Sequence, residues 1–137
     1  MNFSSLPVKR VIALACVIAG GVLIRGYGRG FKIPAFYVKY GGSVLWAAMI
    51  YFLVALLLRT RPQRQVLVVA ALVCALVEAL KLAHTPALDV FRMTRAGIWL
   101  LGKVFSRWNF LAYAVGLALA LGLDALLIGK KLGGRRR

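Results

Sequence analysis

Four long apolar runs dominate this sequence, and short segments rich in Lys and Arg separate them. Each run is apolar around the whole helix rather than along one stripe, a pattern typical of a membrane span or a deep core helix. A water-soluble domain of 137 residues could not bury a composition that is 62% hydrophobic, because its surface-to-volume ratio is too high. We therefore predict that the runs cross a lipid bilayer.

The predicted spans cover residues 8–25, 42–58, 65–83 and 108–128 of a single integral membrane domain, residues 1–137, whose basic tail is 129–137. A helix of about 20 residues crosses a hydrocarbon core of about 30 Å. Only helices and closed barrels satisfy the backbone in lipid, and the strict alternation of a barrel strand is absent. The fold class is therefore predicted to be all-α and polytopic, with four transmembrane helices.

Residues 87–106, before the last span, show a different pattern. Apolar and Thr side chains recur there at helical spacing, at Phe91, Thr94, Ile98, Leu101 and Phe105. Basic side chains fall on roughly the opposite face, at Arg92, Arg95, Lys103 and Arg107. We predict an amphipathic helix that lies in the plane of the membrane interface. Because Gly97 and Gly102 lower its helix propensity, a broken or re-entrant segment is the alternative.

The charge balance is strongly basic, with 19 Lys and Arg against 3 Asp and Glu and a net charge of +16. Basic residues beside apolar runs favour anionic phospholipid headgroups, or an acidic protein surface, as partners. Nucleic acid is not expected, because the basic residues divide between two faces. The predicted contact residues are Arg59, Arg61, Arg64, Arg92, Arg95, Lys103, Arg107, Lys130, Lys131, Arg135, Arg136 and Arg137.

Four spans place both termini on one side of the membrane. The segments on that side are short and dense in Arg, so the positive-inside rule favours cytoplasmic termini. The expected location is the inner (cytoplasmic) membrane of a bacterium.

Two charged side chains interrupt the third predicted span. Glu78 lies about 18 Å along the helix from Val66, beyond the bilayer midplane. Lys81 follows three positions later on the same face, so we expect an ion pair turned towards the other helices. The alternative is that Glu78 contacts an ion or a substrate, because intramembrane carboxylates often mark transport pathways.

Asp124 lies near the end of the fourth span, with Lys130 and Lys131 within about two turns. We expect its carboxylate to face the lipid headgroups. The alternative is that Asp124 pairs with a cation on another helix.

The sequence offers little for catalysis or cofactor binding. No Ser, Cys or Thr has a plausible base partner, and Asp89 is the only acid outside the spans, so an enzyme is not expected. No metal site or cofactor is expected either. A haem or chlorophyll contact at His84, the single histidine, is a minor alternative.

Small residues recur every four positions in two of the spans. They are Ala71, Ala75 and Ala79 in the third, and Ala114, Ala118 and Gly122 in the fourth, beside a second stripe of Ala112, Gly116 and Ala120. Such spacing lets helix backbones approach closely in lipid. With the basic rims, these stripes predict a non-enzymatic accessory or structural subunit that docks on a larger membrane protein complex.

Three segments carry a resemblance to a known family: GGSVLWAAMIYFLVALLLRTRP, VEALKL and LGKVFSRWNFLAYAVG. They are similar to small bacterial integral membrane proteins of unknown function, distantly like VanZ, over residues 41–116. The family pattern has Gly-Asp before Leu-Trp, Glu-x-x-Gln in the third span and aromatic-x-Asp before the last. The family also carries a name that mentions ribosome maturation, a role for which these residues have no signature.

Glu78 matches the Glu of the family pattern, and three other positions depart from it. Ser43 replaces an Asp, Lys81 a Gln and Asn109 an Asp, so each departure removes negative charge or adds positive charge. The resemblance implies a second function class, a VanZ-like transporter or lipid-handling protein that uses Glu78.

Overall fold

The computed structural model describes residues 5–102 and 104–133, with side chains up to residue 129. This part of the chain is helical and contains no strand. The helices are α1 (Leu6–Tyr27), α2 (Ala35–Leu57), α3 (Gln63–Leu80), α4 (Pro86–Met93), α5 (Arg95–Leu100) and α6 (Arg107–Gly133). Four of them, α1, α2, α3 and α6, are long and apolar enough to cross a membrane, which confirms the predicted fold class.

Proline marks the start of four helices. Pro7 lies in the first turn of α1, Pro34 and Pro62 directly precede α2 and α3, and Pro86 opens α4. Proline is tolerated there because the first backbone N–H groups of a helix have no acceptor within it. The largest difference from the predicted bounds is at α2, which begins at Ala35, seven residues before residue 42.

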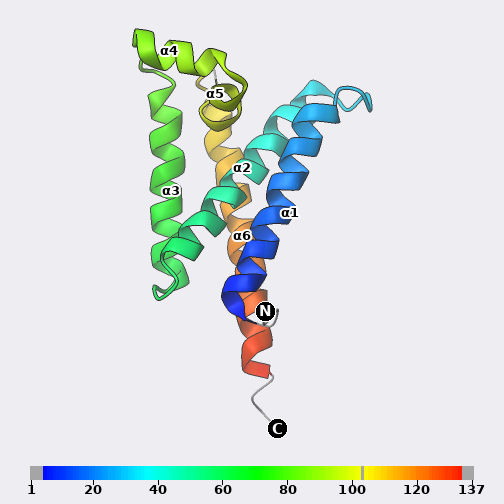
Figure 1. Ribbon diagram of the computed structural model, residues 1–137, viewed down its shortest axis with the longest axis vertical. Coiled ribbons are helices and arrows are strands. Elements are labelled where there is room, and N and C mark those ends of the chain that lie inside the picture. The colour runs from blue at the N-terminus through cyan, green and yellow to red at the C-terminus, as the bar shows by residue number, and fades with distance from the viewer. Residues whose placement is uncertain (1–4, 103, 134–137) are drawn as a thin grey trace.

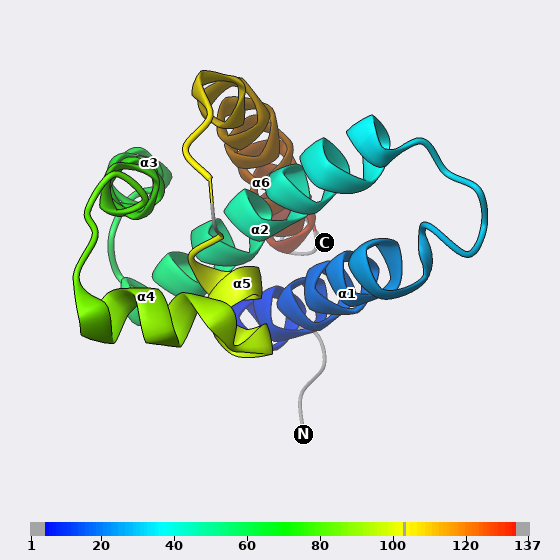
Figure 2. The same cartoon turned by 90° about the horizontal axis from the view of Figure 1, so that it is seen from above.

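The four long helices alternate in direction, so both termini lie at the same end of the molecule (Figure 1). Helix α2 is central. It packs against α1 on one side and against α6 and α3 on the other, as the view along the bundle shows (Figure 2). The side chains of Tyr51, Phe52 and Ala55 are fully buried at this centre. Every other long helix is therefore positioned by its contact with α2.

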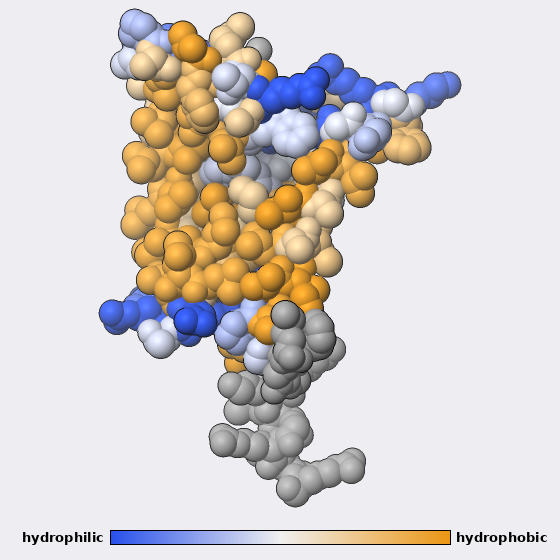
Figure 3. Space-filling model, in the orientation of Figure 1, coloured by the Kyte–Doolittle hydropathy of each residue, from blue (hydrophilic) through white to orange (hydrophobic). Residues whose placement is uncertain are grey.

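The surface has the layering expected of a protein in a bilayer. A broad hydrophobic belt separates two hydrophilic bands, one at each end of the bundle (Figure 3). Large apolar side chains on the belt are exposed, including Leu72, Leu76, Leu119 and Leu126 at more than 60% each. Such a surface is stable only where lipid tails replace water.

The segment before the last span is two short helices, so the alternative of a broken segment is the one observed in place of one continuous amphipathic helix. Thr94 has an extended backbone between α4 and α5, and its Oγ1 accepts a hydrogen bond of 3.0 Å from the backbone N of Gly97. A Cβ on Gly97 would lie 1.9 Å from the carbonyl oxygen of Phe91, so only glycine permits this tight turn. The hydroxyl cap thus begins a new helix in a new direction.

Of the three predicted small-residue stripes, one is buried between helices of the bundle and two are exposed. Ala71, Ala75 and Ala79 are exposed on α3, and so are Ala114, Ala118 and Gly122 on α6. The neighbouring stripe of α6 faces α2 instead, with Ala112, Gly116 and Ala120 buried. A Cβ on Gly116 would lie 2.2 Å from the carbonyl oxygen of Val44, so the two backbones nearly touch.

A pair of matched substitutions on α6 tests this close approach. We expect Gly116→Ala to lower the free energy of unfolding by about 1–3 kcal/mol, because the new methyl group forces α6 away from α2. Gly122→Ala adds the same methyl group where no atom lies within 4 Å, and the better helix propensity of Ala should leave stability unchanged or higher. Unfolding in mixed micelles with an increasing fraction of sodium dodecyl sulfate measures the free energy of unfolding of both variants. Equal effects of the two substitutions would contradict the packing.

Candidate functional site

Glu78 is fully buried at the end of α3 and is the centre of a polar cluster. Its Oε2 accepts a hydrogen bond of 2.6 Å from Lys81 Nζ and one of 2.8 Å from Tyr113 Oη. Its Oε1 accepts bonds of 2.9 Å from the backbone N of Ser106 and 3.0 Å from Asn109 Nδ2. The carboxylate therefore links α3 to the start of α6 and to the segment before it.

The ion pair expected between Glu78 and Lys81 is present, with a side-chain exposure of 0% for Glu78 and 6% for Lys81. Two donors on each oxygen leave the carboxylate well satisfied by this chain's own groups. Glu78 also lies outside the lining of the described cavities, whereas Lys81 lines two of them. The arrangement suits a structural anchor rather than a group that meets an ion or substrate.

Asp124 is the centre of a second buried cluster at the opposite end of the bundle. Arg10 of α1 donates two parallel hydrogen bonds to it, 2.8 Å from Nε to Oδ1 and 2.9 Å from Nη2 to Oδ2. Tyr51 Oη and Gln63 Nε2 each donate a bond of 3.0 Å to Oδ2. Four helices, α1, α2, α3 and α6, thus meet at one carboxylate.

The expectation that Asp124 faces the lipid headgroups is wrong, and the alternative of a cation on another helix is the one observed. Asp124 is 0% exposed and Arg10 is 3% exposed. Sequence reasoning missed Arg10 because it was counted with the basic residues flanking the first span. The available signal was its position at the same end of the bundle as an otherwise unpartnered intramembrane acid.

Arg92 is also buried, 4% exposed, and the prediction that it contacts headgroups is wrong. Its Nη1 donates 2.8 Å to the carbonyl oxygen of Ala83 and 3.3 Å to Asp89, and its Nη2 donates to the carbonyl oxygen of Leu80. The two carbonyl acceptors, of Leu80 and Ala83, lie at and just beyond the end of α3, where carbonyl groups lack partners within the helix. Arg92 therefore fixes α4 across the end of α3.

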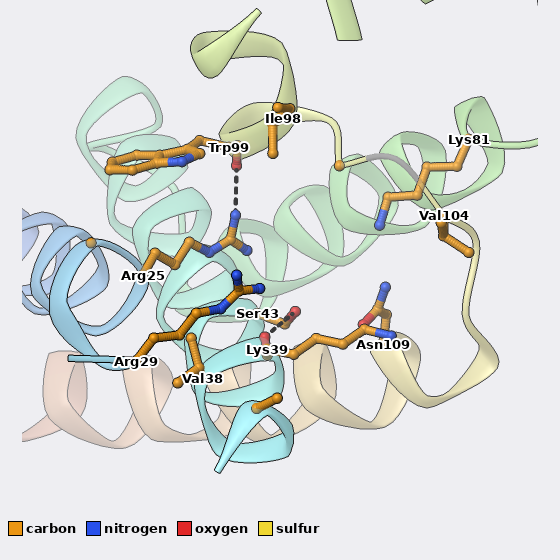
Figure 4. A pocket seen from close by; sticks show the side chains of 13 residues that line it. Arg25, Arg29, Val38, Lys39, Ser43, Lys81, Ile98, Trp99, Val104 and Asn109 are labelled. Atoms are coloured by element: carbon orange, nitrogen blue, oxygen red, sulfur yellow. Dashed lines mark hydrogen bonds between the residues drawn. The ribbon is translucent and has the colours of Figure 1, made fainter. Parts of the chain in front are cut away.

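A cavity of about 690 Å³ opens beside the Glu78 cluster, at the end of the bundle opposite the termini. Its volume is within the range of small-molecule sites. The ends of Arg25, Arg29, Lys81 and Asn109 point towards the same space (Figure 4). Thirteen residues line the cavity, from α1, α2, α5, α6 and the segments beside them: Arg25, Gly26, Arg29, Ala35, Val38, Lys39, Ser43, Lys81, Ile98, Trp99, Gly102, Val104 and Asn109.

Local packing holds two of these cations in place. The side chain of Arg25 crosses α2 at Gly42, where a Cβ would lie 2.6 Å from Arg25 Nε, and its Nη1 donates 3.4 Å to the carbonyl oxygen of Trp99. Lys81 passes close to Gly102, which has a positive φ of 71° and lines the same cavity. Helix α5 and the turn after it therefore cover Arg25 and Lys81 on one side of the cavity.

The cavity lining carries positive charge without a balancing acid. The chain has three Asp and Glu residues, and each is engaged: Glu78 with Lys81, Asp124 with Arg10, and Asp89 with Arg92 and His84. Lys81 is neutralised by its partner. The other three cations of the lining have no carboxylate side chain within 4.0 Å, and they are Arg25, Arg29 and Lys39. An excess of positive charge of this kind attracts anions.

The three positions that depart from the family pattern lie together in this lining. Ser43 comes from α2, Lys81 from the end of α3 and Asn109 from α6. Ser43 and Asn109 are uncharged, and no carboxylate side chain lines the cavity. Nothing in the sequence order indicated that the three positions share one site.

The other predicted contact residues lie at the two ends of the bundle. Arg59, Arg61 and Arg64 are exposed in and beside the turn between α2 and α3, and Arg95 and Arg107 are exposed at the other end. Lys103 and the residues 135–137 lie outside the described part, as do the side chains of Lys130 and Lys131. His84 is exposed after α3, with Nδ1 3.4 Å from Asp89 Oδ1.

A sequence model of the family described as "Protein of unknown function (DUF2809)" matches residues 32–117, more than half of the chain. The chain belongs to this family. The predicted membership in a family of unknown function is thus confirmed, while the distant link to VanZ stays a prediction. No solved structure matches the chain. The DUF2809 region contains the whole Glu78 cluster and most of the cavity lining, whereas Arg10, Arg25, Arg29 and Asp124 lie outside it.

The buried cluster at Asp124 predicts a large loss of stability when its charge is removed. We expect Asp124→Asn to lower the free energy of unfolding by about 3–5 kcal/mol, because it leaves the buried Arg10 guanidinium without its counter-ion. Asp89→Asn is the matched control: its side chain is 48% exposed, and we expect a loss below about 1 kcal/mol. Unfolding in detergent measures both. A small effect of Asp124→Asn would show that the carboxylate reaches the headgroups after all.

Proposed function

We propose that this protein is a non-enzymatic membrane protein that binds the phosphate-bearing headgroup of an anionic lipid in the cavity beneath α5. The observation that carries the proposal is the convergence of Arg25, Arg29 and Lys39 on one cavity with no carboxylate side chain to balance them. Guanidinium groups suit this ligand, because their paired N–H groups match two oxygens of a phosphate. The proposal takes the lipid-handling class implied by the family resemblance and moves its site from Glu78 to these cations.

The depth of the cavity supports a lipid over a water-borne anion. Arg25 is near the last residue of α1, Lys39 is in the first turns of α2, and Lys81 directly follows α3. These positions correspond to the headgroup level of a bilayer that surrounds the apolar belt. Since the dense Arg cluster at the other end favours cytoplasmic termini, we place the cavity at the outer face of a bacterial cytoplasmic membrane.

Removal of two cavity cations provides the test. We expect the double variant Arg29→Gln with Lys39→Gln to bind glycerol phosphate at least about tenfold more weakly than the unmodified protein, because it loses two charge-assisted hydrogen bonds. Ser43→Asp, which adds an acid to the lining, should also weaken binding. Isothermal titration of protein in phosphatidylcholine nanodiscs measures the affinity, and uncharged glycerol gives the background.

The matched control is Arg59→Gln with Arg61→Gln, which removes two exposed cations from the opposite end. This variant should bind glycerol phosphate as the unmodified protein does. Equal weakening in the two double variants would mean that net charge alone attracts the anion. Binding no stronger than that of glycerol would refute the proposal.

A second function, the accessory subunit, is favoured by the two exposed small-residue stripes. The stripes on α3 and α6 are exposed, so they are available to pack against a partner in the same membrane. We expect Ala75→Trp with Ala118→Trp to release a membrane partner that co-purifies in mild detergent, while Leu72→Trp with Leu119→Trp retains it. A clean monomer from native membranes would argue against this function.

A further inference from the structure

A narrow apolar groove runs between α1 and α2 on the membrane-facing surface. It encloses about 210 Å³, and its lining combines aliphatic side chains with Trp46 and Trp99: Val17, Ile18, Gly21, Val22, Arg25, Gly42, Leu45, Trp46, Met49, Trp99 and Leu100. Arg25 is the one charged residue among them. From Arg25 down to Val17 the groove follows α1 for about 12 Å, towards the bilayer midplane.

The groove and the cationic cavity meet at two residues. Arg25 and Trp99 belong to both linings, and between them lies a small space that shares Arg25, Trp99 and Lys81 with the cavity and Trp46 with the groove. The charged site at headgroup depth therefore adjoins an apolar groove at tail depth. This order of environments matches a single amphiphile, with its anionic group in the cavity and its hydrocarbon chain in the groove.

We propose that the groove between α1 and α2 holds an acyl chain of the lipid whose phosphate group occupies the cavity. The inference rests on the proposed function and adds the second half of the ligand. It assigns the site to a lipid phosphate rather than to free phosphate, because only a lipid carries a hydrocarbon chain that reaches the adjoining groove. Val17, Ile18 and Val22 of α1 and Leu45 and Met49 of α2 contact the chain.

The charge and the groove have different tasks in this site. An acyl chain gains little by moving from bilayer to groove, because lipid tails are as apolar as the side chains that line it. The affinity therefore comes from the cations, and the groove decides where the tail lies. This division requires an experiment that reports position rather than affinity alone.

A second apolar groove gives the inference a competitor within the same molecule. It lies between α2 and α6, encloses about 220 Å³ and is lined by Phe36, Tyr40, Val44, Trp108, Leu111, Ala112 and Val115. It shares no lining residue with the cationic cavity. A tail attached to a phosphate in the cavity should therefore prefer the groove of α1 and α2.

Photocrosslinking locates the tail. The full-length protein is placed in phosphatidylcholine nanodiscs with a trace of phosphatidic acid that carries a diazirine near the end of one acyl chain, and the crosslinked peptides are mapped. We expect crosslinks concentrated at residues 17–22 and 45–49, several-fold above those from phosphatidylcholine with the same diazirine chain. An excess of glycerol phosphate should remove this difference.

Two groove variants and one matched control complete the test. Gly21→Leu and Val22→Trp fill the groove from α1 and should remove the excess crosslinks at residues 45–49, while glycerol phosphate still binds. Two variants are used so that the test still stands if one of them fails to fold. Gly122→Leu, on the lipid-facing side of α6 with no atom within 4 Å of its new Cβ, should keep the crosslinks.

The outcomes separate this inference from the proposed function. Crosslinks spread over α3 and α6, or gathered in the groove of α2 and α6, would overturn the tail position while glycerol phosphate binding upheld the headgroup site. A phosphatidic acid pattern equal to the phosphatidylcholine pattern, with glycerol phosphate still bound, would assign the cavity to free phosphate. Absence of glycerol phosphate binding would overturn both.

Discussion

Two buried carboxylates tie this bundle together, one near each end of its apolar belt. The hydrophobic effect cannot hold helices to one another in lipid, because the tails around them are equally apolar. Asp124 joins α1, α2, α3 and α6 at the end near the termini, and Glu78 joins α3 to the start of α6 at the other. Each carboxylate accepts four hydrogen bonds, and two of those to Asp124 come from Arg10. Neither carboxylate is therefore left as a buried unpaired charge.

The cationic cavity is a consequence of this arrangement. All three acidic side chains of the chain take part in structural ion pairs, and the chain has 19 basic residues. Most basic residues therefore have no acidic side chain available as a counter-ion. Five other described cations are exposed at the two ends: Arg59, Arg61, Arg64, Arg95 and Arg107. Arg25, Arg29 and Lys39 instead line one open cavity beneath α5, with Arg25 half-buried and Arg29 and Lys39 exposed. A bound anion would relieve their mutual repulsion, which is the physical basis of the proposed phosphate site.

Sequence reasoning succeeded where one physical rule acted alone. The four spans follow from the cost of exposing backbone polar groups to lipid, and the pair of Glu78 and Lys81 follows from helical spacing. It failed where local and tertiary effects compete. The amphipathic pattern of residues 87–106 was real, yet the hydroxyl of Thr94 and the contact of Gly97 with Phe91 broke the helix. The stripe of Ala114 and Ala118 was also real, yet α6 turned the neighbouring stripe towards α2.

The sequence by itself determined that this chain is a four-span, strongly basic membrane protein with two charged side chains in its third span, because hydropathy and helical spacing are properties of neighbouring residues. Only the tertiary structure decided that Asp124 meets Arg10, that Arg92 caps α3, and that Ser43, Lys81 and Asn109 line one cavity. These contacts join residues from different helices. Their geometry depends on how each helix rotates about its axis and crosses α2, which the side-chain packing of the whole bundle sets.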